Sequence, residues 1–273
     1  MSPVDGQLFK WTASDRLIPF EPTSADALDA RGHLRALMET LQASPGQVLH
    51  GVVSGPGVAG TDLDNALLYN VGGSQAGATR HGVALERHAG GGPGVRYGYR
   101  LTDDPSAGVS TGEQIVRVPE ASLPGHPASW LDIWAAVRRA ARIEVVQEAP
   151  ADRELALRVT VGAPSFRGSA NGEFVKRIID GITTALHESS ALVSTDAAER
   201  LASRARLDTA KIAELLQADD NAVLGETPGL IVARGPGVQC RPRDDRISVL
   251  RIELDRTSTR WSLDATLSAV AAG

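Results

Sequence analysis

Cysteine, aromatic residues and long apolar runs are scarce in this chain of 273 residues. Cys240 is the only cysteine, so the chain has no internal disulfide and no cysteine-based zinc site. No apolar run approaches the roughly 20 residues that a membrane-spanning helix needs. The opening segment, MSPVDGQLFKW, has neither the basic residues nor the apolar core of a secretory signal. We therefore expect a cytoplasmic protein that has no membrane partner.

Strong positive charge is also missing, because 28 Lys and Arg residues stand against 33 Asp and Glu residues and the formal net charge is -5. This balance argues against a polybasic protein that binds nucleic acid through bulk charge, but a local basic groove remains possible. Residues 137–273 carry about twice as many basic side chains as residues 1–136, so such a groove would lie in the second half. The hydrophobic fraction of 42% suffices for a folded core, in one large domain or two ordinary ones.

Helical and alternating apolar patterns, interrupted by glycine and proline, divide the chain into helices and strands. We expect helices over residues 24–41, 130–142, 173–187, 195–206 and 208–216. We expect strands over residues 47–54, 82–88, 95–101, 114–118, 155–161, 230–233 and 246–254. This mixture predicts an α+β (mixed α/β) fold.

The two halves of the chain show a similar order of predicted elements, which indicates an internal duplication. Each runs from a strand through a glycine-containing turn and a helix to Gly-Pro-Gly-Val, a polar loop and a closing strand. On this interpretation the strand at 114–118 corresponds to the strand at 246–254. We predict two related halves, 1–125 and 126–273, each a small sheet with one principal helix, and a helical insert near 195–217. The alternative is a single α+β domain in which such turns recur by chance.

The sharpest local motif is Asp62-Leu63-Asp64-Asn65, between a predicted strand and a short apolar segment. In an extended segment, residues two apart project to the same side, so Asp62 and Asp64 can share one cation. Carboxylate oxygens favour Mg²⁺ or Mn²⁺, and such an ion activates water and stabilises charge on a phosphate. The alternative is that these residues only cap the following helix, which is an ordinary role for Asp and Asn.

Three further motifs are residues 113–116 (EQIV), residues 176–182 (KRIIDGI) and residues 244–247 (DDRI). Together with Asp62-Leu63-Asp64-Asn65, they resemble the RusA family of Holliday-junction resolvases. In that family carboxylates bind Mg²⁺ and a lysine assists the cleavage of branched DNA. The matching residues are Asp62, Asp64 and Asn65 for the first family motif, residues 113–116 (EQIV) for the second, residues 176–182 (KRIIDGI) for the family helix, and residues 244–247 (DDRI) for the acidic segment before the last strand.

The resemblance implies a nuclease site in which a lysine works beside metal-binding carboxylates. Asp62, Asp64 and Lys176 would be the catalytic residues, with Lys176 stabilising a phosphate oxygen. The Mg²⁺ ligands would come from Asp62, Asp64, Glu113, Asp244 and Asp245.

Neither half contains the complete family set of residues. The first half has Tyr69 and Asn70 in the region where a lysine is expected, and the second half has Ala170 and Gly172 in place of the aspartates. Because family members work as dimers, the duplicated chain resembles a fused pair of subunits. Its site then combines pieces from both halves, or its chemistry has been lost.

Arginines crowd the region before the last predicted strand and form the candidate nucleic-acid interface. In a strand, Arg241 and Arg243 share a face and, with Arg246, would contact a phosphate backbone. A solvated sheet edge protected by charge explains the same arginines.

These observations favour a RusA-like nucleic-acid-processing protein, with Mg²⁺-dependent endonuclease activity on branched or single-stranded nucleic acid as the leading hypothesis. The competing hypothesis is a non-catalytic interaction subunit that binds other protein subunits in a larger assembly. The missing motif pieces and the negative charge favour this second hypothesis. An enzyme acting on a small molecule is the third.

Overall fold

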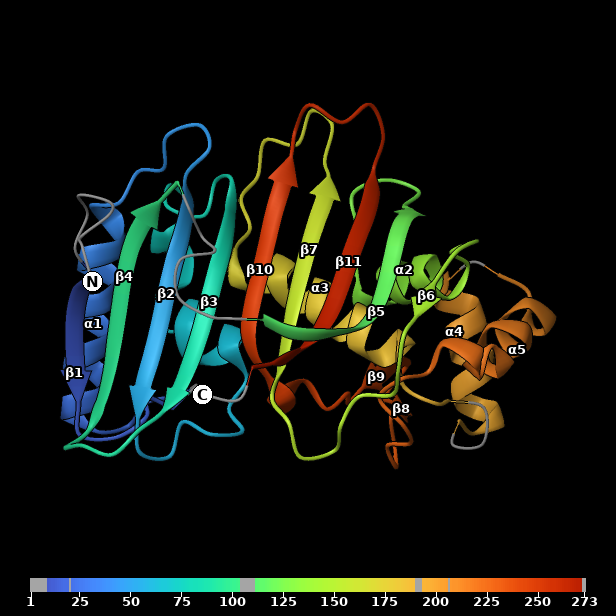
Figure 1. Ribbon diagram of the computed structural model, residues 1–273, viewed down its shortest axis with the longest axis horizontal. Helices are drawn as coiled ribbons and strands as arrows, with labels where there is room; N and C mark the ends of the chain where they lie inside the picture. The colour runs from blue at the N-terminus through green and yellow to red at the C-terminus, as the bar shows by residue number, and fades with distance from the viewer. Residues whose placement is uncertain (1–8, 20, 104–110, 190–192, 206, 272–273) are drawn as a thin grey trace.

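The computed structural model describes residues 9–19, 21–103, 111–189, 193–205 and 207–271. Within these residues the chain forms a nine-stranded mixed sheet, a separate two-stranded sheet and several helices. In Figure 1 some of the helices lie behind the large sheet, and those of residues 195–217 lie beyond its right-hand end. This architecture confirms the α+β fold predicted from the sequence. None of the described helices combines the length and the apolar character required to cross a membrane.

Strands that are far apart in the sequence are neighbours in the large sheet. Among the described residues, its order is β1 (Lys10–Ser14), β4 (Val95–Thr102), β2 (Val48–Gly55), β3 (Gly82–Ala89), β10 (Ile247–Asp255), β7 (Leu155–Gly162), β11 (Ser262–Val270), β5 (Thr111–Ser122) and β6 (Glu144–Val145). The small sheet pairs β8 (Ile231–Arg234) with β9 (Gly237–Cys240).

Side-chain caps explain where several helices begin. Ser24, Asn171 and Asp208 each accept a hydrogen bond from the backbone N–H three residues later, so they satisfy a free donor of the first helical turn. The helical insert predicted near 195–217 consists of the last two α-helices. The helices are α1 (Ala25–Glu39), α2 (Trp130–Arg138), α3 (Gly172–Ala185), α4 (Thr195–Ala205) and α5 (Thr209–Gln217), with short turns η1 (Asn65–Tyr69), η2 (Gly72–Gln75), η3 (Asp219–Asn221) and η4 (Asp244–Arg246).

Helices cover one face of the large sheet, and the other face is turned toward the viewer of Figure 1. Along β10, Leu250, Ile252 and Leu254 are buried, whereas Arg251 and Glu253 between them are partly exposed. Successive side chains of a strand point to opposite faces, so this alternation places the core on the helix side. The opposite side is called the helix-free face below.

Two groups of three strands follow the same path through the large sheet. In one group β2 is parallel to β3 and antiparallel to β4, and in the other β7 is parallel to β10 and antiparallel to β11. The groups meet where β3 pairs antiparallel with β10. β1 and β5 flank the two groups in equivalent positions. This repeated topology is what a duplicated chain requires.

The strands of one group correspond to strands of the other group in a different way from the one predicted from the sequence. The predicted strand at 114–118 lies in β5, which pairs with β11 and therefore belongs with the second group. The counterpart of β10 is β3, and the pairing divides the two groups between β4 and β5 instead of at residue 125. Recurring Gly-Pro-Gly-Val turns mark chain reversals without specifying which strands pair, and this is the reason for the difference.

The contact between α2 and α3 depends on Gly181. A Cβ atom at this position would lie 2.4 Å from the Cβ of Ile133 and 2.6 Å from the carbonyl oxygen of Trp130. We expect Gly181→Ala to lower the free energy of unfolding by about 1–3 kcal/mol, because the contact has no room for a methyl group. Urea unfolding measures this change.

Gly32→Ala, in the exposed part of α1, is the matched control. A Cβ atom there meets nothing within 4 Å, so alanine should raise the free energy of unfolding by about 0.5–1 kcal/mol. Equal effects of the two substitutions would contradict the packing argument.

Candidate metal centre

Three carboxylates from distant parts of the chain converge at one edge of the large sheet. One oxygen of each of Asp62, Asp64 and Asp244 lies within 4.8 Å of the others. Asp62 and Asp64 follow the end of β2, and Asp244 lies in η4 immediately before β10. β2 is parallel to β3, which is antiparallel to β10, so the end of β2 and the start of β10 share one edge of the sheet. Strand pairing therefore assembles this cluster.

Asp64 is buried, and neither of its carboxylate oxygens has a hydrogen-bond partner among the described residues. Burial raises the pKa of Asp64 to about 6; Lys176 opposes this rise, and the negative charge of Asp62 adds to it. The side chain forms no capping hydrogen bond with η1, so helix capping does not account for it. A buried carboxylate without donors is stabilised by a nearby cation.

Asp62 and Asp244 form the more exposed side of the cluster. The Asn65 Nδ2 group donates a hydrogen bond of 2.7 Å to Asp62 Oδ2, which orients this carboxylate. Burial, followed by the negative charge of Asp62, raises the pKa of Asp244 to about 7. Asp64 and Asp244 therefore ionise only at a higher pH than free aspartates do, unless positive charge is added.

Lys176 of α3 lies beside the cluster and carries part of that positive charge. Its Nζ atom is 3.1 Å from Asp180 Oδ1 and 3.8 Å from Asp244 Oδ2. Burial alone would lower the pKa of Lys176, but the charges of Asp64, Asp180 and Asp244 outweigh it and raise this pKa above its ordinary value. The ammonium group therefore stays charged at physiological pH. The centre is composite, with aspartates from the β2 side and a lysine from α3.

Arg87 ties together the two chain segments that supply the carboxylates. Its buried guanidinium donates hydrogen bonds to the carbonyl oxygens of Thr61 and of Asp245, the second at 2.8 Å. It also pairs with Glu154 at 3.2 Å. Thr61 precedes Asp62, and Asp245 follows Asp244. One side chain therefore fixes the positions of the two ligand-bearing segments relative to each other.

Sequence reasoning did not select Arg87 or Asp180 as functional residues. Arg87 lies on the same core-facing side of β3 as Val83 and Leu85. An arginine at a position where the alternating pattern predicts an apolar residue indicates a buried polar contact. Asp180 follows Lys176 by four residues in α3, the spacing at which helical side chains meet.

Two predicted metal ligands lie outside the cluster. Glu113, on β5, accepts a hydrogen bond from Gln147 at 3.3 Å. The Asp245 carboxylate is 43% exposed and lies 3.9 Å from Arg243 Nε, so only its backbone carbonyl supports the centre. Of the acids considered as the third ligand, the structure brings only Asp244 to Asp62 and Asp64.

The three arginines that were predicted to bind nucleic acid differ in their exposure and in their hydrogen bonds. Arg241 and Arg243 are exposed and follow β9 in an irregular segment, so they do not share a strand face as predicted. They directly precede Asp244 in the chain and thus lie near the metal ligands in sequence. Arg246 is held inside by hydrogen bonds to the carbonyl oxygens of Pro150 and Arg153, which favours a structural role.

The repeated topology defines a second, equivalent edge of the sheet, after β7 and before β3. There Ala170 and Gly172 stand in the segment after β7, and Arg80 precedes β3. A Cβ atom on Gly172 would lie 3.2 Å from the Leu68 Cβ, so this glycine allows α3 to approach η1 closely. In the described part of the chain, the cluster of Asp62, Asp64 and Asp244 is the only acidic group with metal-ligand spacing.

Comparison with models of protein families gives no match, and neither curated proteins nor solved structures show significant similarity to this chain.

Without a divalent ion, the contribution of Asp64 and Asp244 to the stability of the protein should fall as the pH rises from about 4 to about 7. The unfolded aspartates release their protons near pH 3.8, whereas folded Asp64 and Asp244 hold theirs to about 6 and about 7. The folded state therefore binds more protons across this interval, and raising the pH favours unfolding. Asp64→Asn should reduce this slope and stabilise the metal-free protein at pH 8 by about 2 kcal/mol.

Urea unfolding in EDTA at several pH values measures this effect. Asp245→Asn is the control, because it removes a neighbouring charge that lies outside the cluster. A pH slope unchanged by Asp64→Asn would show that Asp64 is not desolvated as described.

Proposed function

We propose that the chain is a divalent-metal-dependent nuclease with a single composite centre. The observation that carries this proposal is the convergence of three carboxylates around the buried, unpartnered oxygens of Asp64, with Lys176 beside them. Helix capping explains neither Asp64 nor the meeting of Asp244 with the residues after β2. A cation-binding role accounts for both.

The residues present fit a hard divalent ion such as Mg²⁺ or Mn²⁺, because all the candidate ligands are carboxylate oxygens. Asp62, Asp64 and Asp244 would hold the ion, and Asn65 would keep Asp62 in place. A bound ion of this kind supplies activation of water and stabilisation of charge on a phosphate. The Lys176 ammonium, 34% exposed, would neutralise charge on a phosphate oxygen.

The substrate that fits this chemistry is nucleic acid. The resemblance to the RusA family supports branched DNA. Of the residues that carry it in this chain, Asp62, Asp64, Lys176 and Asp244 lie together in the folded structure, whereas Glu113 does not. Exposed Arg241 and Arg243 precede the centre and offer charge to a phosphate backbone. Because the equivalent edge carries Ala170 and Gly172, we expect one strand cut per bound chain.

Asp62→Asn and Asp64→Asn should each reduce metal-dependent cleavage by at least about 100-fold, because a lost ligand removes several kcal/mol of transition-state stabilisation. The assay uses end-labelled four-way junction, duplex and single-stranded DNA with Mn²⁺ or Mg²⁺. The expected product of the wild type is a nick in one strand.

Asp245→Asn is the matched control, since it changes the same charge one residue from Asp244 and should leave cleavage within about twofold of wild type. Circular dichroism checks that each variant folds. Absence of metal-dependent cleavage by the wild type on all three substrates, or full activity of both cluster variants, would overturn the nuclease proposal. Either outcome would favour the non-catalytic interaction subunit.

A further inference from the structure

The helix-free face of β1 and β4 carries two aromatic rings and two arginines in contact. Phe9, Trp11, Arg96 and Arg100 form this aromatic–arginine strip. The ring centroids of Phe9 and Trp11 are 5.4 Å apart. The guanidinium carbon of Arg96 lies 4.6 Å from the Trp11 ring centroid, and that of Arg100 lies 4.5 Å from the Phe9 centroid. Trp11 is 43% exposed, so the strip reaches solvent.

The backbone beneath the strip is shaped to receive the indole ring. Trp11 pairs with Gly98 of β4, and a Cβ atom on Gly98 would lie 2.7 Å from the Trp11 ring. The missing side chain lets the ring lie against the sheet. A ring held by a rigid sheet loses little freedom when a ligand stacks on it, which favours binding.

The positive charge of the strip is not neutralised by carboxylates. In the described residues, neither Arg96 nor Arg100 forms an ion pair with Asp or Glu. The carboxylate of Glu86, on the same face, is held by His50 at 2.8 Å and by His88 at 3.0 Å. Burial alone would raise the pKa of Glu86, but these two hydrogen bonds lower it to about 2. Glu86 is thus held by two histidines, and Arg100 Nε donates a hydrogen bond of 3.3 Å to His50 Nδ1. Because neither Arg96 nor Arg100 has a carboxylate partner among the described residues, both guanidinium groups can pair with an anion.

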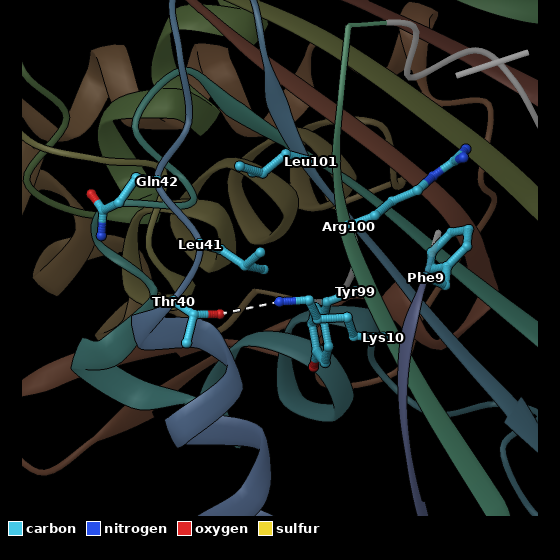
Figure 2. A pocket seen from close by; sticks show the side chains of 8 residues that line it. All are labelled: Phe9, Lys10, Thr40, Leu41, Gln42, Tyr99, Arg100 and Leu101. Atoms are coloured by element: carbon cyan, nitrogen blue, oxygen red, sulfur yellow. Dashed lines mark hydrogen bonds between the residues drawn. The ribbon is translucent and has the colours of Figure 1, made fainter. Parts of the chain in front are cut away.

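A cavity of about 530 Å³ adjoins the strip at Phe9 and Arg100. Figure 2 shows these two side chains beside each other, and Lys10 reaching across toward Thr40. Leu41, Tyr99 and Leu101 contribute apolar lining. Among the described residues, those that line the cavity include the cations Lys10 and Arg100 but no Asp or Glu. An apolar cavity of this size with cations at its rim suits an anionic ligand that has an aromatic body.

We propose that the aromatic–arginine strip binds single-stranded nucleic acid. Unpaired bases expose aromatic faces that stack on Trp, Phe and arginine planes, and their phosphates pair with arginine. Duplex DNA keeps its bases stacked internally and cannot offer these faces to the rings. The strip lies on the opposite face of the sheet from the core, and its residues are separate from the metal centre. Binding here therefore goes beyond the proposed nuclease and needs no metal ion.

Fluorescence anisotropy of a labelled 20-nucleotide oligothymidylate, in EDTA and low salt, tests the proposal. We expect Trp11→Ala to weaken binding by about fivefold or more, because one stacked base is lost. Arg96→Gln with Arg100→Gln should weaken binding and flatten its dependence on salt, since fewer counterions are released. Arg158→Gln, an exposed cation of β7 on the same face, is the matched control and should bind as the wild type does.

Three results would overturn the proposal: no binding by the wild type at low salt, unchanged binding by both strip variants, or equal binding of duplex DNA. If Arg158→Gln weakened oligothymidylate binding as much as the strip variants do, the binding would depend on overall positive charge and not on a defined strip. Asp64→Asn should leave oligothymidylate binding unchanged. Oligothymidylate binding without metal-dependent cleavage would contradict the nuclease proposal and support the binding strip. Metal-dependent cleavage without strip-dependent binding would support the nuclease proposal and contradict the binding strip.

Discussion

The antiparallel pairing of β3 with β10 is the interaction on which the rest of this structure depends. It joins the two strand groups into one sheet, with Glu86 opposite Val249 and Gly82 opposite Glu253. It also turns β10 so that its first residue lies at the edge where β2 ends. Asp244 meets Asp62 and Asp64 only because of this junction. A parallel pairing would have placed Asp244 at the far edge.

Arg87 strengthens the junction at the point where the ligands meet. It belongs to β3, yet it holds the carbonyl of Thr61 after β2 and the carbonyl of Asp245 before β10. Burying a guanidinium costs free energy unless its N–H groups find acceptors. Carbonyls from both ligand segments, together with Glu154, supply acceptors for the two Nη groups, whereas the buried Nε has no partner among the described residues. The same contacts that offset the burial of Arg87 therefore fix the geometry of the carboxylates.

The metal centre concentrates charge that the fold by itself does not neutralise. Burial raises the pKa of Asp64 to about 6 and that of Asp244 to about 7, and Lys176 offsets only part of this desolvation. Asp180 engages the same lysine at 3.1 Å, which leaves the three-carboxylate cluster still rich in negative charge. Functional sites are often places where a fold retains such unfavourable electrostatics. The opposite sheet edge, with Ala170 and Gly172, avoids this cost and carries no comparable cluster in the described residues.

The helices and strands of this protein could be predicted from the amino-acid sequence, because local structure depends on neighbouring residues. Alternation identified strands such as β7 and β10, and Asp208 identified the start of α5. The sequence also singled out Asp62 and Asp64, because side chains two residues apart in an extended segment project to the same side and can share a cation.

The correspondence between strands and the identity of the third acid in the cluster depend on contacts between distant parts of the chain. β3, not the strand at 114–118, is the counterpart of β10, and Asp244, not Glu113 or Asp245, lies with Asp62 and Asp64. The contact of Arg87 with the Asp245 carbonyl joins residues 158 positions apart in the chain. Local pattern carries no information about such pairings, because the burial and hydrogen bonding that select them exist only once the whole sheet has formed.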